Sequence, residues 1–494
     1  MNYELGMVIR NLDTIKDMKI QFKNIGLILL LLAGVAWPGQ AEIKLPALFT
    51  DYVVLQQQSD VAVWGWADAK ESVVVKPSWS DEVYSTKADK SGKWKLNIKT
   101  PVAGGPFELS VSDGTEVVLH DIMIGEVWLC SGQSNMEMPM KGFPGQPVEG
   151  SNMDILKSKN NNIRMITVPR GKTPVIKDDF NGKWITASPE TVAEFSATGY
   201  YFGRLLNEML DVPVGLIDVT FGGSCIQAWM SEETSVPFND TPLPNMDDIP
   251  NIPNRTPTVL FNSMLNPVIG FGMKGCIWYQ GETNYESPDQ YEKLFPEMVA
   301  EWRKLWNIGE FPFYYMQIAP FDYSMFQHDT INPKFNSAYL RDAQRKSMNN
   351  ISNSGMAVIM DIGEKTCIHP KKKKVGGERL ALWALGDTYG IKGFGFKSPS
   401  LNAIEIKGSK VVVSFNDVGE GLTTFGQDLT GFEIAGENKI FFPAQVYLRR
   451  KSVVVSSPHV EKPVAVRYAF DDFVIGTLFG TNGLPVSSFR SDEW

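Results

Sequence analysis

Between residues 119 and 395 the chain alternates short apolar runs with segments of helical periodicity. Each apolar run is long enough for one buried strand. Apolar residues recur at helical spacing over 194–210, 290–306 and 375–385. Alternation of strands and helices predicts a parallel sheet with helices on both faces, which is a three-layer α/β/α domain. The expected strands are 126–130, 214–219, 275–279, 313–318 and 357–361.

The segments on either side of this region have β character. Within 42–118, β-branched and aromatic runs are separated by turn sequences such as 89–92, which predicts a small sandwich. Within 396–494, β-branched runs such as 410–415 return. The sequence therefore predicts accessory all-β regions at both ends of the α/β domain at 119–395.

The segment 1–41 resembles an export signal peptide. Two lysines precede an apolar stretch at 25–36, and small residues for cleavage follow at 39–41. The stretch is shorter than the roughly 20 apolar residues that span a bilayer. The pattern begins more naturally at Met18 than at Met1. We expect an exported protein, periplasmic or secreted, with no stable membrane span.

The charge of the chain argues against a nucleic-acid partner. The net charge is −9 over 494 residues, and the densest basic cluster is the lysine run 371–374. Proteins that bind nucleic acid usually carry a basic face. We therefore expect no nucleic-acid partner and interpret the lysine run as a solvated helix start.

Polar motifs follow four of the five expected strands. Ligands of open parallel sheets bind beyond the carboxyl ends of the strands, so these motifs mark the candidate site. The motifs contain Ser134 after the first strand, Gly222 and Gly223 after the second, Gln280 to Asn284 after the third and His369 after the fifth.

Ser134 and His369 are the candidate nucleophile and base. A serine hydroxyl is a weak nucleophile until a base takes its proton. Among four histidines, only His369 follows an expected strand of the α/β domain, and Pro370 places it at a helix start. The hypothesis requires these two side chains to meet at one edge of the sheet, although they lie far apart in the sequence.

Groups that face a developing oxyanion are also present in the motifs. Gly132 permits a tight turn, so that a backbone N–H at or after Ser134 can face the oxyanion. Gly222 and Gly223 let the backbone approach a ligand closely. The side chains of Gln280 and Asn284 are further candidate donors, and Asn284 can alternatively cap the following turn.

These motifs resemble those of the sialate O-acetylesterase family, a branch of the SGNH (GDSL-like) hydrolases. The first motif, at 125–138, is long and specific. The segments 45–49 and 483–490 extend the resemblance to nearly the whole mature chain. The other motifs that carry it are 222–224, 228–229, 278–284, 368–370 and 377–381.

The resemblance implies an SGNH-hydrolase (flavodoxin-like) fold and a serine esterase that removes O-acetyl groups from sugars, typically sialic acids. It implies no metal or organic cofactor, and an O-acetylated sugar or glycan as the binding partner. It makes Ser134 the nucleophile and His369 the general base. The remaining residues that it implies are the N–H groups of Ser134 and Gly223 with Gln280 or Asn284 in the oxyanion hole, and Gln133 and Glu282 at the substrate.

The third catalytic residue departs from the family pattern. Related chains commonly carry an Asp two or three residues before the histidine, where this chain has Cys367 and Thr366. We expect Glu364, ranked slightly above Asp361, to orient His369. A Ser–His dyad held by a backbone carbonyl is the alternative.

Two of the four cysteines lie in predicted catalytic loops: Cys225 follows the glycine motif at 222–223, and Cys367 lies two residues before His369. An oxidising compartment would permit a disulfide between them. The favoured interpretation is two buried free thiols.

Two other functions stay open from the sequence. An acetylesterase for plant polysaccharides such as xylan or pectin would use the same catalytic residues and differ in the loops that line the pocket. A non-catalytic carbohydrate-binding protein would use some of the 13 Trp and 15 Tyr for stacking on sugars. The sequence does not determine the oligomeric state.

Overall fold

A computed structural model describes residues 43–238, 243–245, 247, 249–327 and 335–494. The expected signal peptide at 1–41 and the histidine His328 lie outside the described residues. Among the helices of the described part, none is long and apolar enough to cross a bilayer.

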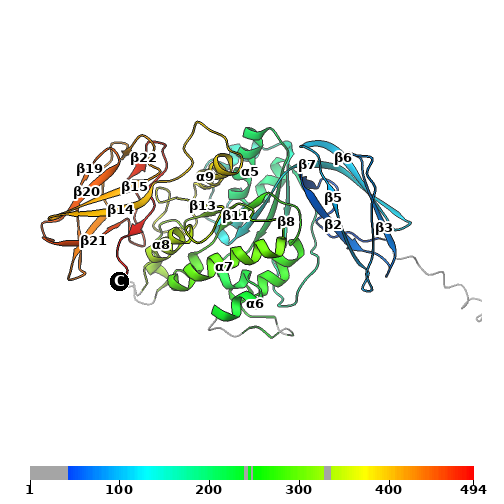
Figure 1. Cartoon of the computed structure of the whole chain (residues 1–494), viewed down its shortest axis with the longest axis horizontal. Coiled ribbons are helices and arrows are strands. Elements are labelled where there is room, and N and C mark those ends of the chain that lie inside the picture. Colours follow the sequence, from blue (N-terminus) through cyan, green and yellow to red (C-terminus); the bar gives the residue numbers. More distant parts are fainter. Residues whose placement is uncertain (1–42, 239–242, 246, 248, 328–334) are drawn as a thin grey trace, which may run out of the picture.

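A mixed sheet forms the centre of the molecule (Figure 1). Its strands run in the order β13-β12-β11-β7-β10-β8-β9, and all neighbours are parallel except the antiparallel pair of β8 and β9. The strands are β7 (Glu116–Gly132), β8 (Asn160–Thr167), β9 (Ile185–Ala187), β10 (Val214–Thr220), β11 (Gly275–Tyr279), β12 (Phe313–Met316) and β13 (Ser354–Ala357).

Helices cover both faces of this sheet because successive strand residues point to opposite sides. Val127 and Leu129 of β7 belong to the core shared with α7 (Pro288–Trp306) and α8 (Ala338–Ser347). Trp128 and Cys130 belong to the core shared with α5 (Ala197–Leu210) and α9 (Lys373–Trp383). The shorter helices are α2 (Ser134–Glu137), α3 (Ser151–Leu156), α4 (Pro189–Glu194) and α6 (Glu232–Ser235).

Strand β7 belongs to two parts of the fold at once. Its first half pairs with β6 (Gly104–Ser112) and β1 (Val54–Gln56), and its second half pairs with β10 and β11. Both sides of β7 are buried from Ile122 onward. The boundary expected between residues 118 and 119 therefore falls inside one continuous strand, which joins the N-terminal β region to the central sheet.

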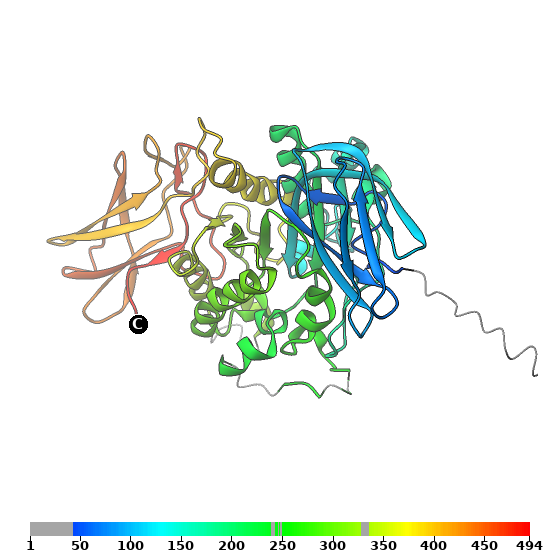
Figure 2. The ribbon, with the colours of Figure 1, turned by 45° about the vertical axis from the view of Figure 1, so that its right-hand side comes forward.

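The two β regions lie on opposite sides of the α/β region (Figure 2). The N-terminal one also contains β2 (Asp60–Trp66), β3 (Ser72–Pro77), β4 (Tyr84–Lys87) and β5 (Lys93–Lys99). In the C-terminal one, β14 (Ser400–Lys407), β15 (Lys410–Asn416), β20 (Ser452–Ser456) and β19 (Gln445–Leu448) form one antiparallel sheet. A second contains β18 (Phe441–Pro443), β17 (Phe432–Gly436), β21 (Pro463–Tyr468) and β23 (Phe489–Arg490), and β16 (Leu422–Thr423) pairs with β22 (Phe479–Gly480).

The central elements differ from the sequence expectation in several places. The last expected strand, 357–361, is displaced, because β13 ends at Ala357 and the backbone then turns at 359–362. Strand β8 and helix α8 were not expected, since both carry polar residues that interrupt an apolar pattern.

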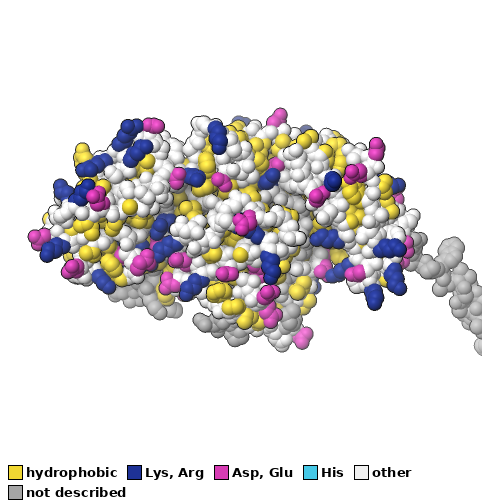
Figure 3. Space-filling model, viewed as in Figure 1, with side chains coloured by type: hydrophobic (Ala, Val, Ile, Leu, Met, Phe, Trp, Pro, Cys, Tyr) yellow, Lys and Arg dark blue, Asp and Glu magenta, His cyan; other side chains and the backbone are white. Residues whose placement is uncertain are grey.

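On the face shown in Figure 3, basic and acidic side chains are interspersed over the central region.

Gly132, the last residue of β7, is held in a conformation that other residues rarely adopt. Its φ is +138°, and an added Cβ would lie 2.2 Å from the carbonyl oxygen of Tyr279. We predict that Gly132→Ala lowers the free energy of unfolding by about 2 kcal/mol or more, measured by urea denaturation. Gly309→Ala is the matched control, because Gly309 has φ +82° with open space around it and should cost only about 1 kcal/mol. Equal losses for the two variants would contradict the close approach.

Candidate active site

Ser134 and His369 meet at the carboxyl edge of the central sheet. Ser134 begins α2, two residues after β7 ends, and His369 lies in the loop between β13 and α9. The Oγ of Ser134 is 2.8 Å from Nε2 of His369, although the residues are 235 positions apart. The geometry is that of a hydroxyl donating to an imidazole that can take its proton.

The other ring nitrogen of the imidazole contacts an amide rather than a carboxylate. The Nδ1 of His369 is 2.6 Å from Oε1 of Gln146. When Nε2 accepts from Ser134, Nδ1 carries the hydrogen and donates it to this oxygen. The ring of Phe143 packs edge-on against the imidazole, with 5.3 Å between ring centroids. Gln146 therefore selects the tautomer that an acid would select, but adds no negative charge.

The two carboxylates expected to orient His369 are engaged elsewhere. Asp361 accepts from Nη1 and Nη2 of Arg379 at 2.6 and 2.7 Å. Glu364 accepts from the backbone N–H of Lys371 at 2.9 Å. The expectation that Glu364 or Asp361 orients His369 is thus corrected. Arg379 and the backbone N–H of Lys371 hydrogen-bond to these carboxylates, and Gln146 hydrogen-bonds to the imidazole instead.

Burial and a nearby cation hold the imidazole neutral. Loss of water around the ring, reinforced by the ammonium of Lys373, lowers the pKa of His369 to about 4. Among the described residues, no carboxylate is hydrogen-bonded to the ring to raise this pKa. The histidine is therefore unprotonated, and able to act as a base, at any pH well above 4.

A buried polar network lies behind the nucleophile. The Nδ2 of Asn135 donates to Oε1 of Glu282 at 2.5 Å and to the carbonyl oxygen of Ile368 at 3.0 Å, and its Oδ1 accepts from Nζ of Lys373. Asn135 thus ties the helix of Ser134 to the residue before His369. Burial raises the pKa of Glu282 and lowers that of Lys373 to about 7.

Glu282 and Gln133 do not take the substrate-facing positions that the family resemblance implies. Glu282 is 4% exposed and belongs to the network of Asn135. Gln133 is 2% exposed, and its Oε1 accepts from the backbone N–H groups of Gly281 and Thr283 at 3.2 and 3.4 Å. Both side chains brace the loops that follow β7 and β11.

Two backbone N–H groups remain available beside the nucleophile. Among the described residues, neither the N–H of Ser134 nor that of Gly223 donates a hydrogen bond. Gly223 has φ +66°, and a Cβ added to the adjacent Gly222 would lie 3.3 Å from Cβ of Ser134. The glycine loop thus lies against the nucleophile, and its N–H groups can face an oxyanion.

The side chains expected to assist these donors have other roles. The Nε2 of Gln280 donates to the carbonyl oxygen of Ser224 at 3.0 Å and to Oδ1 of Asn284 at 2.8 Å, so both of its hydrogens are used. Asn284 also accepts from the N–H of Ile226 and donates from Nδ2 to Gln227. The expectation that Gln280 donates to the oxyanion is corrected, because its amide hydrogens bond to Ser224, next to the glycine loop, and to Asn284.

The cysteines of the catalytic loops are free thiols. The Sγ of Cys225 lies 3.4 Å from the carbonyl oxygen of Arg255, and that of Cys367 lies 3.3 Å from the carbonyl oxygen of His369. The disulfide between them is absent. In the described part of the chain, His, Cys, Asp and Glu side chains do not gather in groups of three that could hold a metal ion.

Comparison of the chain with known proteins identifies the family to which it belongs. A family model described as carbohydrate esterase, sialic acid-specific acetylesterase matches residues 124–369, from β7 to the histidine. The crystal structure of a carbohydrate acetylesterase from Xanthomonas citri superimposes with a TM-score of 0.83 and 33% sequence identity, over 92% of this chain and 100% of that one. The chain belongs to this family of carbohydrate esterases.

Mammalian relatives give the same result for this esterase. It is 26% identical to sialate O-acetylesterase of Mus musculus over 90% of this chain and 92% of that protein. It is 29% identical to the Homo sapiens enzyme of the same name over 73% of each chain. The esterase is a carboxylic ester hydrolase.

Replacement of Gln146 by glutamate should change the pH dependence of this esterase. A carboxylate at Nδ1 favours the protonated imidazole and raises the pKa of His369, by about one unit or more for a close charge pair. Since the base must be neutral, kcat/KM falls as pH drops through this pKa. We predict that Gln146→Glu moves the acid limb to higher pH, measured with p-nitrophenyl acetate.

Two further variants test whether Gln146 orients the imidazole. Gln146→Ala should lower kcat/KM by roughly tenfold or more, because the tautomer is no longer fixed. Glu364→Gln is the control, since Glu364 contacts a backbone amide, and should leave the acid limb in place. A limb that moves with Glu364→Gln and not with Gln146→Glu would reverse the assignment.

Proposed function

We propose that the esterase hydrolyses O-acetyl esters of carbohydrates through an acetyl-serine intermediate, with Ser134 as nucleophile and His369 as base. The observation that carries this proposal is the 2.8 Å contact between Oγ of Ser134 and Nε2 of His369. The unengaged N–H groups of Ser134 and Gly223 beside it support the same reaction.

The first half-reaction is acyl transfer to the serine. Nε2 of His369 takes the hydroxyl proton while Oγ of Ser134 attacks the acetyl carbonyl carbon. The carbonyl oxygen becomes an oxyanion that the two backbone N–H groups face, and one such donor contributes about 3–4 kcal/mol. The imidazolium then protonates the sugar oxygen, the ester C–O bond breaks and the sugar leaves as an alcohol.

The second half-reaction regenerates the serine. Nε2 of His369 takes a proton from water, whose oxygen attacks the acetyl carbon. The bond from that carbon to Oγ of Ser134 then breaks, Oγ receives the proton from the imidazolium, and acetic acid is released and ionises in solvent to acetate. In both halves the imidazolium faces the neutral oxygen of Gln146. The transient positive charge is therefore balanced mainly by the oxyanion, so the base is charged only while the intermediate exists.

O-acetylated sialic acids are the proposed substrates, because the mouse and human relatives are sialate O-acetylesterases. The helices on both faces of a largely parallel sheet support an SGNH-hydrolase, three-layer α/β/α fold for 119–395, with accessory β regions at 42–118 and 396–494. The pattern of segment 1–41 supports export to the periplasm or beyond the cell.

An acetylesterase for plant polysaccharide is the second candidate. The relative from Xanthomonas citri, a carbohydrate acetylesterase, shares 33% identity, against 26% and 29% for the mouse and human sialate O-acetylesterases. Its catalytic residues would be the same, and only the surrounding loops would select a different sugar.

Removal of the serine hydroxyl tests the mechanism. We predict that Ser134→Ala lowers kcat on p-nitrophenyl acetate by about a thousandfold or more, to near background, while the circular dichroism spectrum is unchanged. Ser131→Ala is the matched control, because the hydroxyl of Ser131 is buried and donates to the carbonyl oxygen of Val219. A folded Ser134→Ala protein that retains turnover would refute the nucleophile.

A substrate panel with acetate detection separates the candidates. We predict a kcat/KM at least tenfold higher on O-acetylated N-acetylneuraminic acid than on acetylated xylo-oligosaccharide or acetylated pectin. The reverse order would favour the polysaccharide esterase. Absence of acetate release from every ester, p-nitrophenyl acetate included, would leave the non-catalytic carbohydrate-binding alternative.

A further inference from the structure

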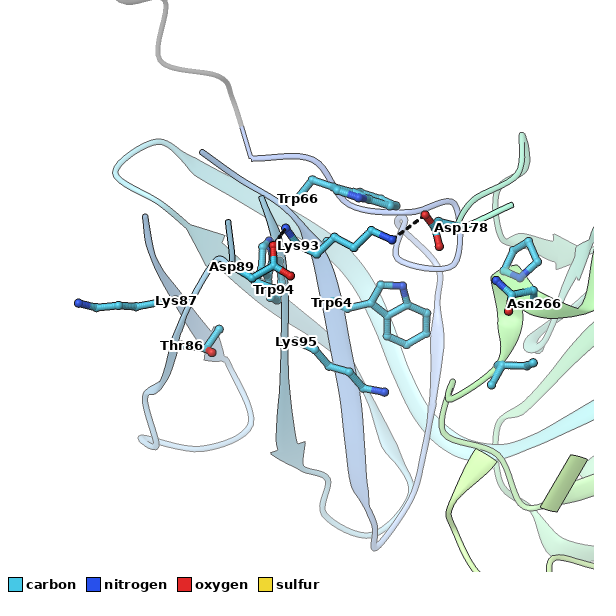
Figure 4. Close-up of a pocket in the computed structure, with 13 residues that line it drawn as sticks. Trp64, Trp66, Thr86, Lys87, Asp89, Lys93, Trp94, Lys95, Asp178 and Asn266 are labelled. Carbon is cyan, nitrogen blue, oxygen red and sulfur yellow. Dashed lines mark hydrogen bonds and ion pairs between the residues drawn. The ribbon is translucent and has the colours of Figure 1, made fainter. Parts of the chain in front are cut away.

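A groove on the N-terminal β region carries two tryptophans and two lysines on one face (Figure 4). Strands β2 and β5 pair antiparallel, with Trp64 opposite Lys95 and Trp66 opposite Lys93. Side chains directly opposite in such a pair project from the same face. The two indoles and the two ammonium groups therefore share one surface, which faces Asp178 in Figure 4.

The other wall of the groove belongs to the central region. It contains Asn266 and Pro267 from the short turn η5 (Asn266–Val268), together with Asp178. The cavity between the walls has a volume of about 470 Å³, within the range of small-molecule sites. Nζ of Lys93 pairs with Asp178 across it at 2.7 Å. Both side chains are half-exposed, so the pair contributes little stability and can open for a ligand.

The indoles are held in place and remain accessible. Trp64 packs edge-on against Phe49, with 4.9 Å between ring centroids, and Nζ of Lys44 lies 5.1 Å from the ring centroid of Trp66. Both indoles are nevertheless partly exposed. Trp64 and Trp66 are two residues apart in β2, so their positions in the strand are about 7 Å apart. A rigid, accessible aromatic surface of this kind suits the apolar C–H face of a sugar ring.

The charge of the groove indicates which sugar it suits. Nζ of Lys95 lies 5.7 Å from the centroid of the Trp64 ring, and among the described residues it pairs with no carboxylate. The lining contains three lysines, Lys87, Lys93 and Lys95, against two aspartates, Asp89 and Asp178. The groove is therefore net positive, although the chain as a whole carries a net charge of −9. A carboxylate on the bound ring would complete this pair.

We propose that the groove defined by Trp64, Trp66, Lys93, Lys95 and Asn266 binds a carboxylate-bearing sugar residue of an acidic glycan. An indole stacks on the ring, and Lys95 pairs with its carboxylate. The Nδ2 of Asn266 donates to the carbonyl oxygen of Lys177 at 2.8 Å, which leaves its Oδ1 to accept from a sugar hydroxyl.

This groove is remote from the ester-hydrolysing site. Asn266 and Pro267 precede β11, whereas Ser134 follows β7, and the two strands run parallel. The groove therefore lies toward the amino-terminal edge of the central sheet and Ser134 at the carboxyl edge. A sugar residue held in the groove cannot itself be the ester attacked by Ser134. The groove instead supplies a second attachment point for a polymeric or surface-bound glycan.

The test is isothermal titration of the full chain with unacetylated oligosaccharides. The probes are sialic acid oligomers and galacturonic acid oligomers, and xylo-oligosaccharides are the neutral comparison. We expect an acidic oligomer to bind, the neutral one not to bind, and the affinity to fall as salt is added. Whichever acidic oligomer binds more tightly identifies the source of the carboxylate.

Variants assign the binding to the groove. We expect Lys95→Glu and Trp66→Ala each to weaken binding at least tenfold. Lys99→Glu is the matched control on the same face of β5, outside the groove, and should change the affinity less than twofold. Lys95 is exposed, so Lys95→Glu keeps the test informative if Trp66→Ala does not fold.

Turnover of p-nitrophenyl acetate separates this proposal from the proposed function, since all three variants should hydrolyse it as the unmodified chain does. Three results would each overturn the groove: no binding of either acidic oligomer, equal affinity for the neutral oligomer, or equal effects of Lys95→Glu and Lys99→Glu. If the unmodified chain did not hydrolyse p-nitrophenyl acetate, that result would instead count against the esterase mechanism.

Discussion

The hydrogen bond between Ser134 and His369 depends on the way the central sheet is assembled. Parallel strands deliver all their carboxyl ends to one edge, so the loops after β7 and β13 can meet although they are 235 positions apart. Gly132 makes the turn that presents the serine, because its backbone passes against the carbonyl of Tyr279 where no side chain fits. Asn135 then fixes the distance by bonding to the residue before the histidine.

The neutral group at Nδ1 of His369 gives this site its electrostatic character. A carboxylate there would raise the pKa of the base, whereas Gln146 orients the ring and leaves the pKa near 4. The buried ammonium of Lys373 acts in the same direction. Such a base stays unprotonated in mildly acidic surroundings, and its conjugate acid readily returns the proton to the leaving sugar.

The two ends of the sheet have different roles in the molecule. The carboxyl edge holds the groups for ester hydrolysis, and the amino-terminal edge joins the N-terminal β region through the shared strand β7. The groove between β2, β5 and the turn at Asn266 lies toward this amino-terminal edge, away from Ser134. An accessory glycan site in this place would hold a substrate chain while its acetylated residues reach the other edge.

The sequence by itself determined the alternation of strands and helices, the all-β character of both ends, and the candidates Ser134, His369 and Gly223, because these depend on local periodicity and on short motifs. It did not reveal Gln146, since a lone glutamine in a loop 223 positions from the histidine has no local signature. Glu364 and Asp361 were favoured because they are near His369 in sequence, but Lys371 and Arg379 engage them in space. Only the tertiary structure decided which polar groups pair, because buried hydrogen bonds are chosen by three-dimensional proximity and each donor or acceptor can satisfy few partners.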